Sequence, residues 1–580
     1  MLLEVLRGAF QSVANEMAVA VELAAYSLAI TEGRDFSGSL YDALGFLVSQ
    51  GHEDLPVHVG TAQHTVRAVM DAIGVDAMRP EDIYVMNDPF MGGTHVNDVR
   101  LVMPIFHDTA IVAFVATTAH WTDVGGMVPG SFCQEGRDCF QEGLRITPCA
   151  IVSSGRLNEP LLHLLMANLR MPYESEGDLR AQIAACRAGT SRFHELVDKY
   201  GIETISAGMA ELQDYAERVF RSEIADLRDG EYTWEDRVDE DFYTGEPKVI
   251  RLTLTVQGDR LIYDFRQSDG LAQCSINTTF VGTFAAVFVT AKALYPEVPF
   301  NAGIMRAIEL LTTPGTIVDA RPPAAVGGFG ATSWEKIACC CLSVYSQIAP
   351  DRTIAGSYNL INAYFGGHNP VTDRDYVCYV WSEGGVGATA HQDGPSAMQS
   401  FFNASTRNIP VEILERSAPI LIERYELRED TGGAGRHRGG LGTTRYIRML
   451  DVDARLSICG DRKRFAAPGL LGGEDSTTQT VLLEGHDGGT ADLGVCVSNY
   501  VVSPGDRIVI HSMGGAGFGD PLDRDAQLIL EDVLDGYLSV ERAFEQYGAV
   551  IVRHDDDGRV CEIDVDGTAS EQGRRRSARR

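Results

Sequence analysis

The stretch from Asn87 to Ser131 reads NDPFMGGTHVNDVRLVMPIFHDTAIVAFVATTAHWTDVGGMVPGS. It contains two apolar runs with polar interruptions, 99–106 and 110–117, on either side of the polar tripeptide His107-Asp108-Thr109. This pattern is typical of two antiparallel strands joined by a short turn. The stretch therefore predicts a β-hairpin, and the residues at its open end are brought together by the strand register.

The register of this hairpin predicts a cluster of metal-binding side chains. With Asp108 at the centre of the turn, facing residues have numbers that sum to about 216, within a residue or two. His120 is then expected opposite Val96. Its imidazole would lie beside His95 and Asp98, beyond the open end of the hairpin.

Two imidazoles and one carboxylate form a ligand set suited to Zn, Mn or Fe, and three protein ligands leave positions free for water or substrate. The hairpin thus predicts a metal site of the catalytic type. The alternative is that His95 and Asp98 form a local turn pair and that His120 is an ordinary histidine at a strand end. The register favours the metal site, because it makes a spatial prediction that chance matches would not meet.

Two motifs in this stretch, NDP-x2-GGTH-x2-D and AH-x4-GG-x2-PGS, resemble those of the hydantoinase B family. That family covers N-methylhydantoinase B subunits, the matching half of 5-oxoprolinases, caprolactamase beta subunits and a related subunit of acetone and acetophenone carboxylases. The resemblance extends from about Glu4 to Val550 and includes three further segments, which are Arg34-Asp35-Phe36-Ser37, Leu55-Pro56-Val57-His58-Val59-Gly60 and Arg321-Pro322-Pro323-Ala324-Ala325-Val326.

The resemblance implies that His95, Asp98 and His120 hold a divalent metal, Zn, Mn or Fe. It also implies a further carboxylate from the N-terminal segment, for which we choose Asp35 over Asp42. The alternative for Asp35 is a helix or strand cap, which a D-x-S sequence readily supplies. The residues and the resemblance agree on the three ligands of the hairpin.

The resemblance further implies a hydrolase of cyclic amides that works with a partner. In such systems a separate A subunit with an actin-like ATPase fold uses ATP to phosphorylate the carbonyl oxygen, and the B subunit opens the activated ring. The chain contains no G-x4-G-K-[ST] motif, so we expect ATP to be bound by the partner. We therefore expect a hetero-oligomer that acts on a small cyclic amide.

A general base is needed if the metal alone does not deprotonate the attacking water. Asp35, Asp123 and Glu142 are candidates, because they lie close in sequence to the ligands. His58 is a candidate for orienting a ligand from outside the coordination sphere, and Asp123 has the alternative role of fixing the His120 ring.

Two other functions are compatible with the sequence. One is a subunit of an ATP-dependent ketone carboxylase, in which the metal would hold an enolate or enol phosphate for attack on carbon dioxide. Its relatives tend to have longer chains, which favours the hydrolase. The other is a non-catalytic scaffold for the ATPase partner, against which the intact ligand triad argues.

A chain of 580 residues exceeds a single core, and we expect about two to four domains. The pattern predicts an α+β fold with an N-terminal metal-site domain at 1–229 and a mixed α/β domain at 230–418. A β-rich domain closed by helices is expected at 419–555, and a disordered basic tail at 556–580, with binding of an anionic partner as the alternative role for the tail.

The periodicity of apolar residues predicts the main elements. Helices are expected at 5–26, 161–169, 176–188, 193–220, 282–293, 524–536 and 540–547, and strands at 248–256, 259–265 and, punctuated by glycine pairs, from residue 420 onward.

Glycine-rich loops at 326–330, 366–368 and 384–387 are candidates for the substrate side of the pocket, because glycine lets backbone amides face a small polar ligand. His391 and Asp393 follow the last loop and are candidates for substrate contact. The alternative is that these loops are tight turns.

A basic cluster in the C-terminal third is a candidate for receiving a phosphorylated intermediate, with ordinary pairing to carboxylates as the alternative. Its members are Arg436, Arg438, Arg462, Lys463 and Arg464.

The net charge of −32 argues against nucleic-acid binding, which needs Lys and Arg on the contacting face. The 12 cysteines contain no C-x-x-C pair, and Cys339-Cys340-Cys341 are expected to be buried thiols in a helix. No apolar stretch is long enough to cross a membrane, and no secretory signal is apparent. We therefore expect a cytoplasmic protein without a membrane partner.

Overall fold

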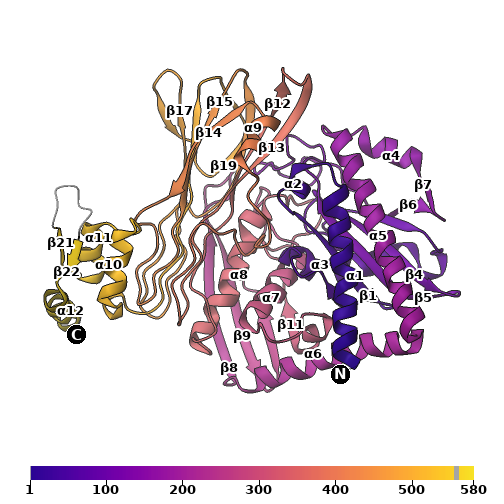
Figure 1. Cartoon of the computed structure of the whole chain (residues 1–580), viewed down its shortest axis with the longest axis horizontal. Coiled ribbons are helices and arrows are strands. Elements are labelled where there is room, and N and C mark those ends of the chain that lie inside the picture. The colour runs from indigo at the N-terminus through magenta and orange to yellow at the C-terminus, as the bar shows by residue number, and fades with distance from the viewer. Residues whose placement is uncertain (1, 554–560, 580) are drawn as a thin grey trace.

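The predicted hairpin lies at the centre of a seven-stranded antiparallel sheet in the N-terminal third of the chain (Figure 1). The computed structural model describes residues 2–553 and 561–579. The strand order is β2-β1-β5-β4-β3-β6-β7, with β1 Phe36–Asp42, β2 Leu47–Gln50, β3 Ile83–Met86, β4 Asp98–His107, β5 Ala110–His120, β6 Cys149–Ser153 and β7 Arg156–Leu157.

Both faces of this sheet are buried. Successive residues of a strand point to opposite faces, and in β4 Val99 and Leu101 face one apolar cluster while Val102 faces another. The helices of this region are α1 Leu2–Ala24, α2 Leu28–Thr31, α3 Pro56–Ile73, α4 Glu159–Met166, α5 Pro172–Tyr200 and α6 Ile202–Ala225. The first cluster contains residues of α1 and α5, and the second contains residues of α3. The sheet is therefore enclosed between two helical layers.

The middle of the chain adds a second sheet with the strand order β11-β10-β9-β8. Its elements are β8 Gly230–Val238, β9 Lys248–Gln257, β10 Arg260–Asp264, β11 Ile308–Leu311, α7 Phe280–Leu294 and α8 Ser333–Ser343. One apolar cluster joins Val57 and Phe114 to Leu252 and Phe288, across the predicted boundary at 229/230. This boundary stays a prediction, and the segments on either side of it share a core.

Two further sheets pack on each other through a third apolar cluster. The first has the order β13-β12-β16-β19, with β12 Ile361–Asn369, β13 Arg374–Ser382, β16 Ala454–Cys459 and β19 Cys496–Val502. The second has the order β14-β15-β20-β17-β18, with β14 Ile420–Leu427, β15 Thr443–Met449, β17 Thr480–Glu484, β18 Thr490–Asp492 and β20 Arg507–His511, next to α9 Val411–Ser417. The predicted α+β fold is confirmed.

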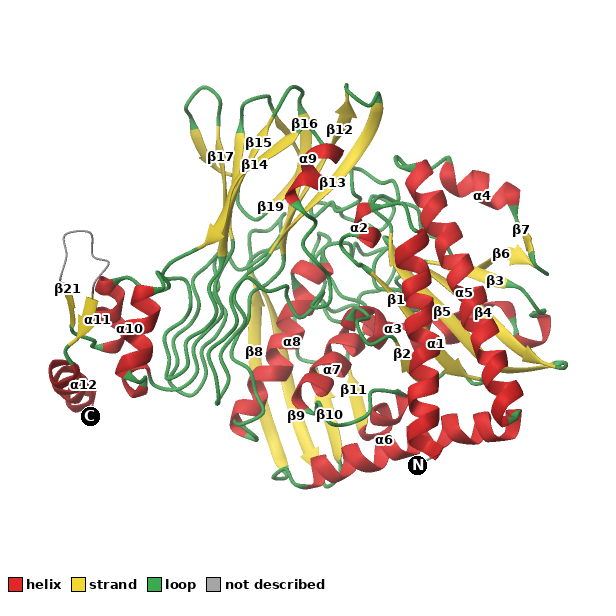
Figure 2. Cartoon of the chain, in the orientation of Figure 1, coloured by secondary structure: helices red, strands yellow, loops and turns green. Residues whose placement is uncertain are grey.

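Between these sheets and the C-terminus lies a layer of extended segments that belong to no strand. We call the segments 384–395, 431–442, 467–475 and 512–519 the glycine layer. Figure 2 shows long loops that run side by side below β14 and β17. Their backbones bond to one another, since the Gly515 amide donates to the Gly440 carbonyl at 2.9 Å. The glycine pairs at 432–433, 439–440 and 472–473 do lie between strands, as predicted, and they belong to this layer.

The C-terminal segment is ordered in the described part of the chain, so the prediction of a disordered tail is wrong for 561–579. Strand β22 (Cys561–Ile563) pairs with β21 (Ile551–Arg553), and the arginine-rich end forms α12 (Val565–Arg579). The arginines find acidic partners, with Arg576 2.7 Å from Asp523. Residues 556–560 and 580 lie outside the described residues. The preceding helices are α10 Ala526–Leu534 and α11 Val540–Tyr547.

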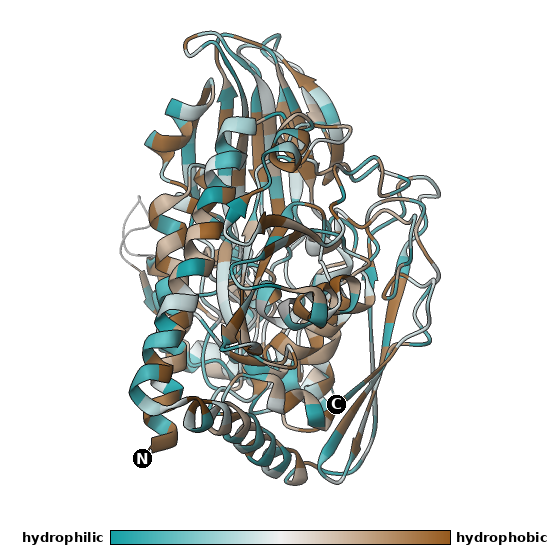
Figure 3. Cartoon of the chain, turned by 90° about the vertical axis from the view of Figure 1, so that its right-hand side faces the viewer, coloured by the Kyte–Doolittle hydropathy of each residue, from teal (hydrophilic) through white to brown (hydrophobic). Residues whose placement is uncertain are grey.

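Short 3-10 turns connect several elements, namely η1 Val75–Ala77, η2 Ala302–Ala307, η3 Phe329–Ala331, η4 Val344–Gln347 and η5 Pro521–Asp523. Cys339, Cys340 and Cys341 are buried free thiols on α8, as predicted. Among the described helices none is both long and apolar enough to span a bilayer. In Figure 3 the long helices on the side facing the viewer alternate between brown and teal, as expected of helices with one apolar face.

Candidate metal centre

The β4–β5 hairpin places Asp98 directly opposite His120. The prediction placed Val96 opposite His120, and the observed partner differs by two residues, which is within the predicted tolerance. The difference arises because the turn consists of Asp108-Thr109 alone, and a bulge near the turn shifts the pairing further. The predicted consequence is confirmed, because the three ligand candidates lie within 4.8 Å of one another.

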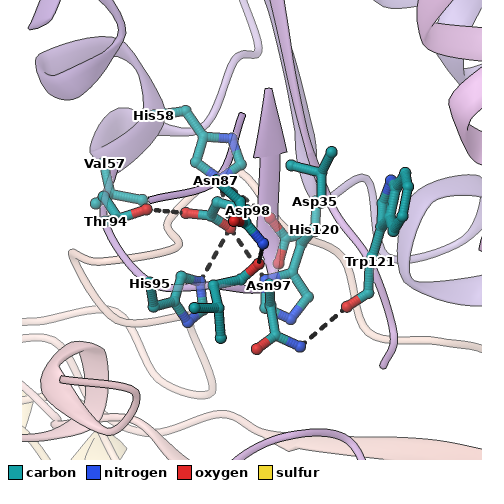
Figure 4. A network of polar contacts seen from close by, with 12 residues as sticks. Asp35, Val57, His58, Asn87, Thr94, His95, Asn97, Asp98, His120 and Trp121 are labelled. Atoms are coloured by element: carbon teal, nitrogen blue, oxygen red, sulfur yellow. Dashed lines mark hydrogen bonds and ion pairs between the residues drawn. The ribbon is translucent and has the colours of Figure 1, made fainter. Parts of the chain in front are cut away.

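Two more polar side chains reach the same point from elsewhere in the sheet region (Figure 4). Asp35 immediately precedes β1, which pairs with β5, and its carbonyl oxygen accepts the His120 backbone amide at 3.0 Å. His58 lies in the first turn of α3. Strand pairing and a helix start therefore add a carboxylate and an imidazole to the cluster.

Asp98 Oδ1 is the centre of the cluster. It lies 3.0 Å from His95 Nε2, 3.1 Å from His120 Nδ1 and 3.4 Å from His58 Nε2. The Asp35 Oδ1 atom lies 3.6 Å from the same His58 nitrogen. Ligand atoms about 2.1 Å from one tetrahedral ion are about 3.4 Å apart. The spacing of these side chains thus suits a shared cation.

The cluster also contains buried polar atoms that lack a partner. Both ring nitrogens of His58, the Nδ1 atom of His95 and the Oδ1 atom of Asp35 make no hydrogen bond within the described residues. Buried polar atoms are normally satisfied. Atoms left open beside a carboxylate and two further imidazoles are what a metal site provides, so the residues fit the divalent ion that the sequence predicts.

Burial and charge act differently on the two carboxylates. Burial raises the pKa of Asp35 to about 7, although the nearby His120 opposes this shift. Burial would also raise the pKa of Asp98, but His95, His58 and a hydrogen bond from His120 lower it well below its usual value. The pKa values of the two carboxylates are therefore shifted in opposite directions.

A buried arginine, Arg100, orients Asp98 through the hydroxyl of Thr94. The Arg100 guanidinium donates to Thr94 Oγ1 at 2.9 Å, and the Thr94 hydroxyl donates to Asp98 Oδ2. This bond occupies the carboxylate oxygen that faces away from the histidines. Outer contacts of this kind fix the orientation of a metal ligand.

Tyr379 fixes the orientation of the His120 ring. Its hydroxyl donates to the Thr122 carbonyl at 2.7 Å and lies 3.3 Å from His120 Nε2. The other ring nitrogen, His120 Nδ1, lies 3.1 Å from Asp98 Oδ1, so both nitrogens of this ring have a polar neighbour. Phe132 stacks on the same ring at 5.7 Å.

The side chains surround a cavity of about 30 Å³. A cavity of this size holds about two water molecules. The wall is mostly aromatic, and its rings shield the histidines from solvent. These rings come from four separate regions of the chain and are Phe132, Phe329, Tyr364, Tyr379, Trp381 and Phe402. The loop 326–330 contributes to this wall, as the sequence predicted.

The other predicted catalytic carboxylates have structural contacts instead. Asp123 accepts the backbone amides of Gly125 and Gly130 and pairs with Arg170 at 2.9 Å. Glu142 accepts the amides of Val326 and Gly327. Neither lines the cavity, which removes both from the candidates for a general base.

Asp42 likewise caps the end of β1, where its Oδ1 atom accepts two backbone amides at 2.9 Å. It does not line the cavity, so Asp35 is the better placed of the two N-terminal candidates.

The candidates in the glycine layer are also placed elsewhere. Asp393 forms an ion pair with Arg524 at 2.7 Å, and His391 is exposed; neither lines the cavity. The basic cluster is largely paired with carboxylates, the alternative that the sequence left open. Its ion pairs are Arg438–Asp532, Arg462–Asp236, Lys463–Asp492 and Arg464–Glu240.

Three supporting residues were not predicted. Arg100 gave a signal, because a charged residue stands inside an apolar strand between Val99 and Leu101. Thr94 belongs to the GGTH motif. No feature of the sequence identifies Tyr379, since it is one aromatic residue in an apolar strand far along the chain.

Comparison with known proteins agrees with these features. The family model described as Hydantoinase B/oxoprolinase matches residues 1–521. The chain is 30% identical to the B component of a putative D-/L-hydantoinase from a Pseudomonas strain, over 94% of both chains. It is also 30% identical to the beta chain of the caprolactamase of Pseudomonas jessenii, over 95% of this chain and 96% of that one.

Solved structures share the fold. The crystal structure of ATP-dependent caprolactamase from Pseudomonas jessenii superposes with a TM-score of 0.90 at 29% identity, covering 98% of this chain and 99% of that one. A nucleotide-free acetone carboxylase has a TM-score of 0.91 at 21% identity over 100% of this chain and 83% of that one. The chain belongs to the hydantoinase B/oxoprolinase family.

Proposed function

We propose that this protein is the metal-dependent B subunit of an ATP-dependent cyclic-amide hydrolase. The observation that carries the proposal is the convergence of three histidines and two aspartates on one small cavity. The relatives support the substrate class, since their names specify a hydantoinase and a caprolactamase. A scaffold would not need unpartnered imidazoles in its interior.

His95, Asp98 and His120 would hold the metal, Zn, Mn or Fe, and His58 is placed to serve as a further ligand. A divalent cation bound there acidifies a water molecule and balances negative charge on the substrate oxygen. The surrounding side chains limit solvent access to the cavity. Tyr379 orients the ring of His120, and Thr94 orients the carboxylate of Asp98.

Asp35 is the best candidate for the general base. Its Oδ1 atom is unpartnered, it lines the cavity, and burial raises its pKa to about 7. A base with a pKa near the working pH is effective both in accepting a proton from water and in returning it to the leaving nitrogen.

A partner that consumes ATP completes the proposal. An unstrained amide carbonyl is a poor electrophile, and phosphorylation of its oxygen by an actin-like ATPase subunit would activate the carbon. Water would then add to this carbon, the C–N bond would break as nitrogen takes up a proton, and a second water would release phosphate from the resulting acyl phosphate. The two relatives are named as components of larger enzymes, which supports a hetero-oligomer.

The test is to purify the chain together with its ATPase subunit and to measure ATP turnover with hydantoins, 5-oxoproline, lactams and acetophenone. We expect turnover with a cyclic amide, independent of bicarbonate, and one divalent metal per chain by elemental analysis. Turnover that requires bicarbonate would identify a ketone carboxylase instead. ATP turnover that no cyclic amide stimulates would contradict the hydrolase.

A further inference from the structure

The cavity at the histidines is too small for the substrate that the proposed function requires. Its volume of about 30 Å³ admits about two water molecules. A five- to seven-membered ring with a phosphate group has several times the volume of water. The activated substrate must therefore be received at a second place that communicates with this cavity.

A larger cavity of about 350 Å³ lies directly behind Tyr379. Tyr379 lines both cavities, so a single side chain forms part of the wall between them. The larger cavity is formed by α2, the start of α5, β13 and α9. It opens to solvent at the exposed side chains of Arg374 and Arg416.

The two arginines give this cavity an affinity for anions. Among the described residues neither lies within 4.0 Å of a carboxylate oxygen, although Arg374 is near enough to Glu174 to oppose the rise of the pKa of that carboxyl. Asp375, which also lines the cavity, is engaged by His368 at 3.0 Å. Burial raises the pKa of Glu174 to about 7, so its negative charge is only partly present near neutral pH.

The interior offers hydroxyl groups and apolar surface. Thr122 Oγ1 and the Tyr376 hydroxyl are buried in the wall and have no hydrogen-bond partner among the described residues. Leu28, Ile409 and Leu414 supply apolar contacts. An arginine-rimmed mouth, free hydroxyls and an apolar interior match a phosphate attached to a small apolar ring.

We propose that the cavity behind Tyr379 is the receiving site for the O-phosphorylated cyclic amide, with Arg374 and Arg416 binding its phosphate. This inference rests on the proposed function and names the site at which the intermediate enters. The Tyr379 hydroxyl contacts both His120 and the Thr122 carbonyl, so movement of its ring would connect arrival of the intermediate to the metal centre.

The test uses phenylphosphonate, an anion on an apolar ring, and the metal-loaded protein in a calorimetric titration. We expect Arg374→Ala and Arg416→Ala each to weaken binding by about tenfold, as for loss of a hydrogen bond to a charged group. Arg455→Ala is the control, because Arg455 is exposed and does not line the cavity. Binding that survives both variants unchanged, or that disappears when the metal is removed, would overturn the proposal.

A second measurement separates this proposal from the proposed function. In the complex with the ATPase subunit, the arginine variants should consume ATP while opening fewer rings per ATP, because the intermediate is lost to water. An unchanged ratio would contradict the receiving site. If the arginines bind phenylphosphonate but no cyclic amide stimulates ATP turnover, the anion site stands and the hydrolase fails.

Discussion

The metal centre and the glycine layer are both assembled from segments distant in the sequence, yet they depend on different atoms. At the metal centre, side chains approach one another, with His95 Nε2 and His120 Nδ1 3.0 and 3.1 Å from Asp98 Oδ1. In the glycine layer, backbones approach one another, and a Cβ built on Gly515 would overlap the Val386 carbonyl oxygen. The first region depends on the functional groups of its side chains, and the second depends on the absence of a Cβ atom from its glycines.

This difference predicts opposite responses to small substitutions. Removing a ligand side chain at the candidate metal centre should abolish ring opening and leave the protein folded, because the sheet that holds this side chain is buried on both faces. Adding one methyl group in the glycine layer should damage the fold at most positions, because most of the close contacts there are to backbone.

The largest expected effect is that of Gly515→Ala. The new methyl group would collide with the Val386 carbonyl and the Gly387 amide, and we expect a loss of about 3 kcal/mol or more of the free energy of unfolding. Thermal unfolding measures this loss. The control is Gly8→Ala, where nothing lies within 4 Å of the added group; equal stability of the two variants would contradict a tightly packed layer.

The next effect is that of His120→Ala, which should separate function from stability. We expect loss of the bound metal and a decrease of on the order of a thousandfold in cyclic-amide turnover, with an unfolding temperature close to that of the unsubstituted protein without metal. The control is His107→Ala at the other end of the hairpin. Full activity of the His120 variant would remove the metal centre from the mechanism.

A smaller effect is expected for Thr94→Val, which removes the hydroxyl that orients Asp98. Metal affinity should fall by about 10- to 100-fold, as for other outer contacts of metal ligands. Thr94→Ser keeps the hydroxyl and should restore affinity. Competition with a chelator gives the dissociation constants, and equal values for both variants would show that this hydroxyl does not act on the metal.

A last effect, which depends on pH, concerns Glu142, a carboxyl that holds the glycine-containing loop 326–330 by backbone bonds. Burial raises its pKa from 4.5 to about 8. Between these values the folded protein retains a proton that the unfolded chain has lost, so this group lowers stability as pH rises.

Glu142→Gln should remove this dependence, because the amide stays neutral and keeps an acceptor oxygen. We expect the free energy of unfolding of the variant to rise relative to that of the unsubstituted protein between about pH 5 and pH 8, by up to a few kcal/mol. Denaturant unfolding at several pH values measures the difference. A constant difference across this range would mean that the carboxyl is ionised in the folded state.

Much of the fold was predictable from local patterns. The helices at 5–26, 282–293 and 540–547 were predicted within a few residues of α1, α7 and α11, because a buried stripe at helical spacing is visible in the sequence. The C-terminal arginines were misjudged. Their order comes from acidic partners such as Asp523 on another segment, which the local sequence does not reveal.

The sequence by itself determined the core of the metal centre. Asp98 and His120 face each other in one hairpin and His95 lies three residues before its first strand, so turn length and strand pairing suffice to bring these candidate ligands together. Only the tertiary structure decided that Asp35 and His58 join them, that Tyr379 fixes the His120 ring and that the glycines at 384–519 form a packed layer. These contacts join segments whose separation in sequence carries no information about distance, because they depend on how sheets and helices pack.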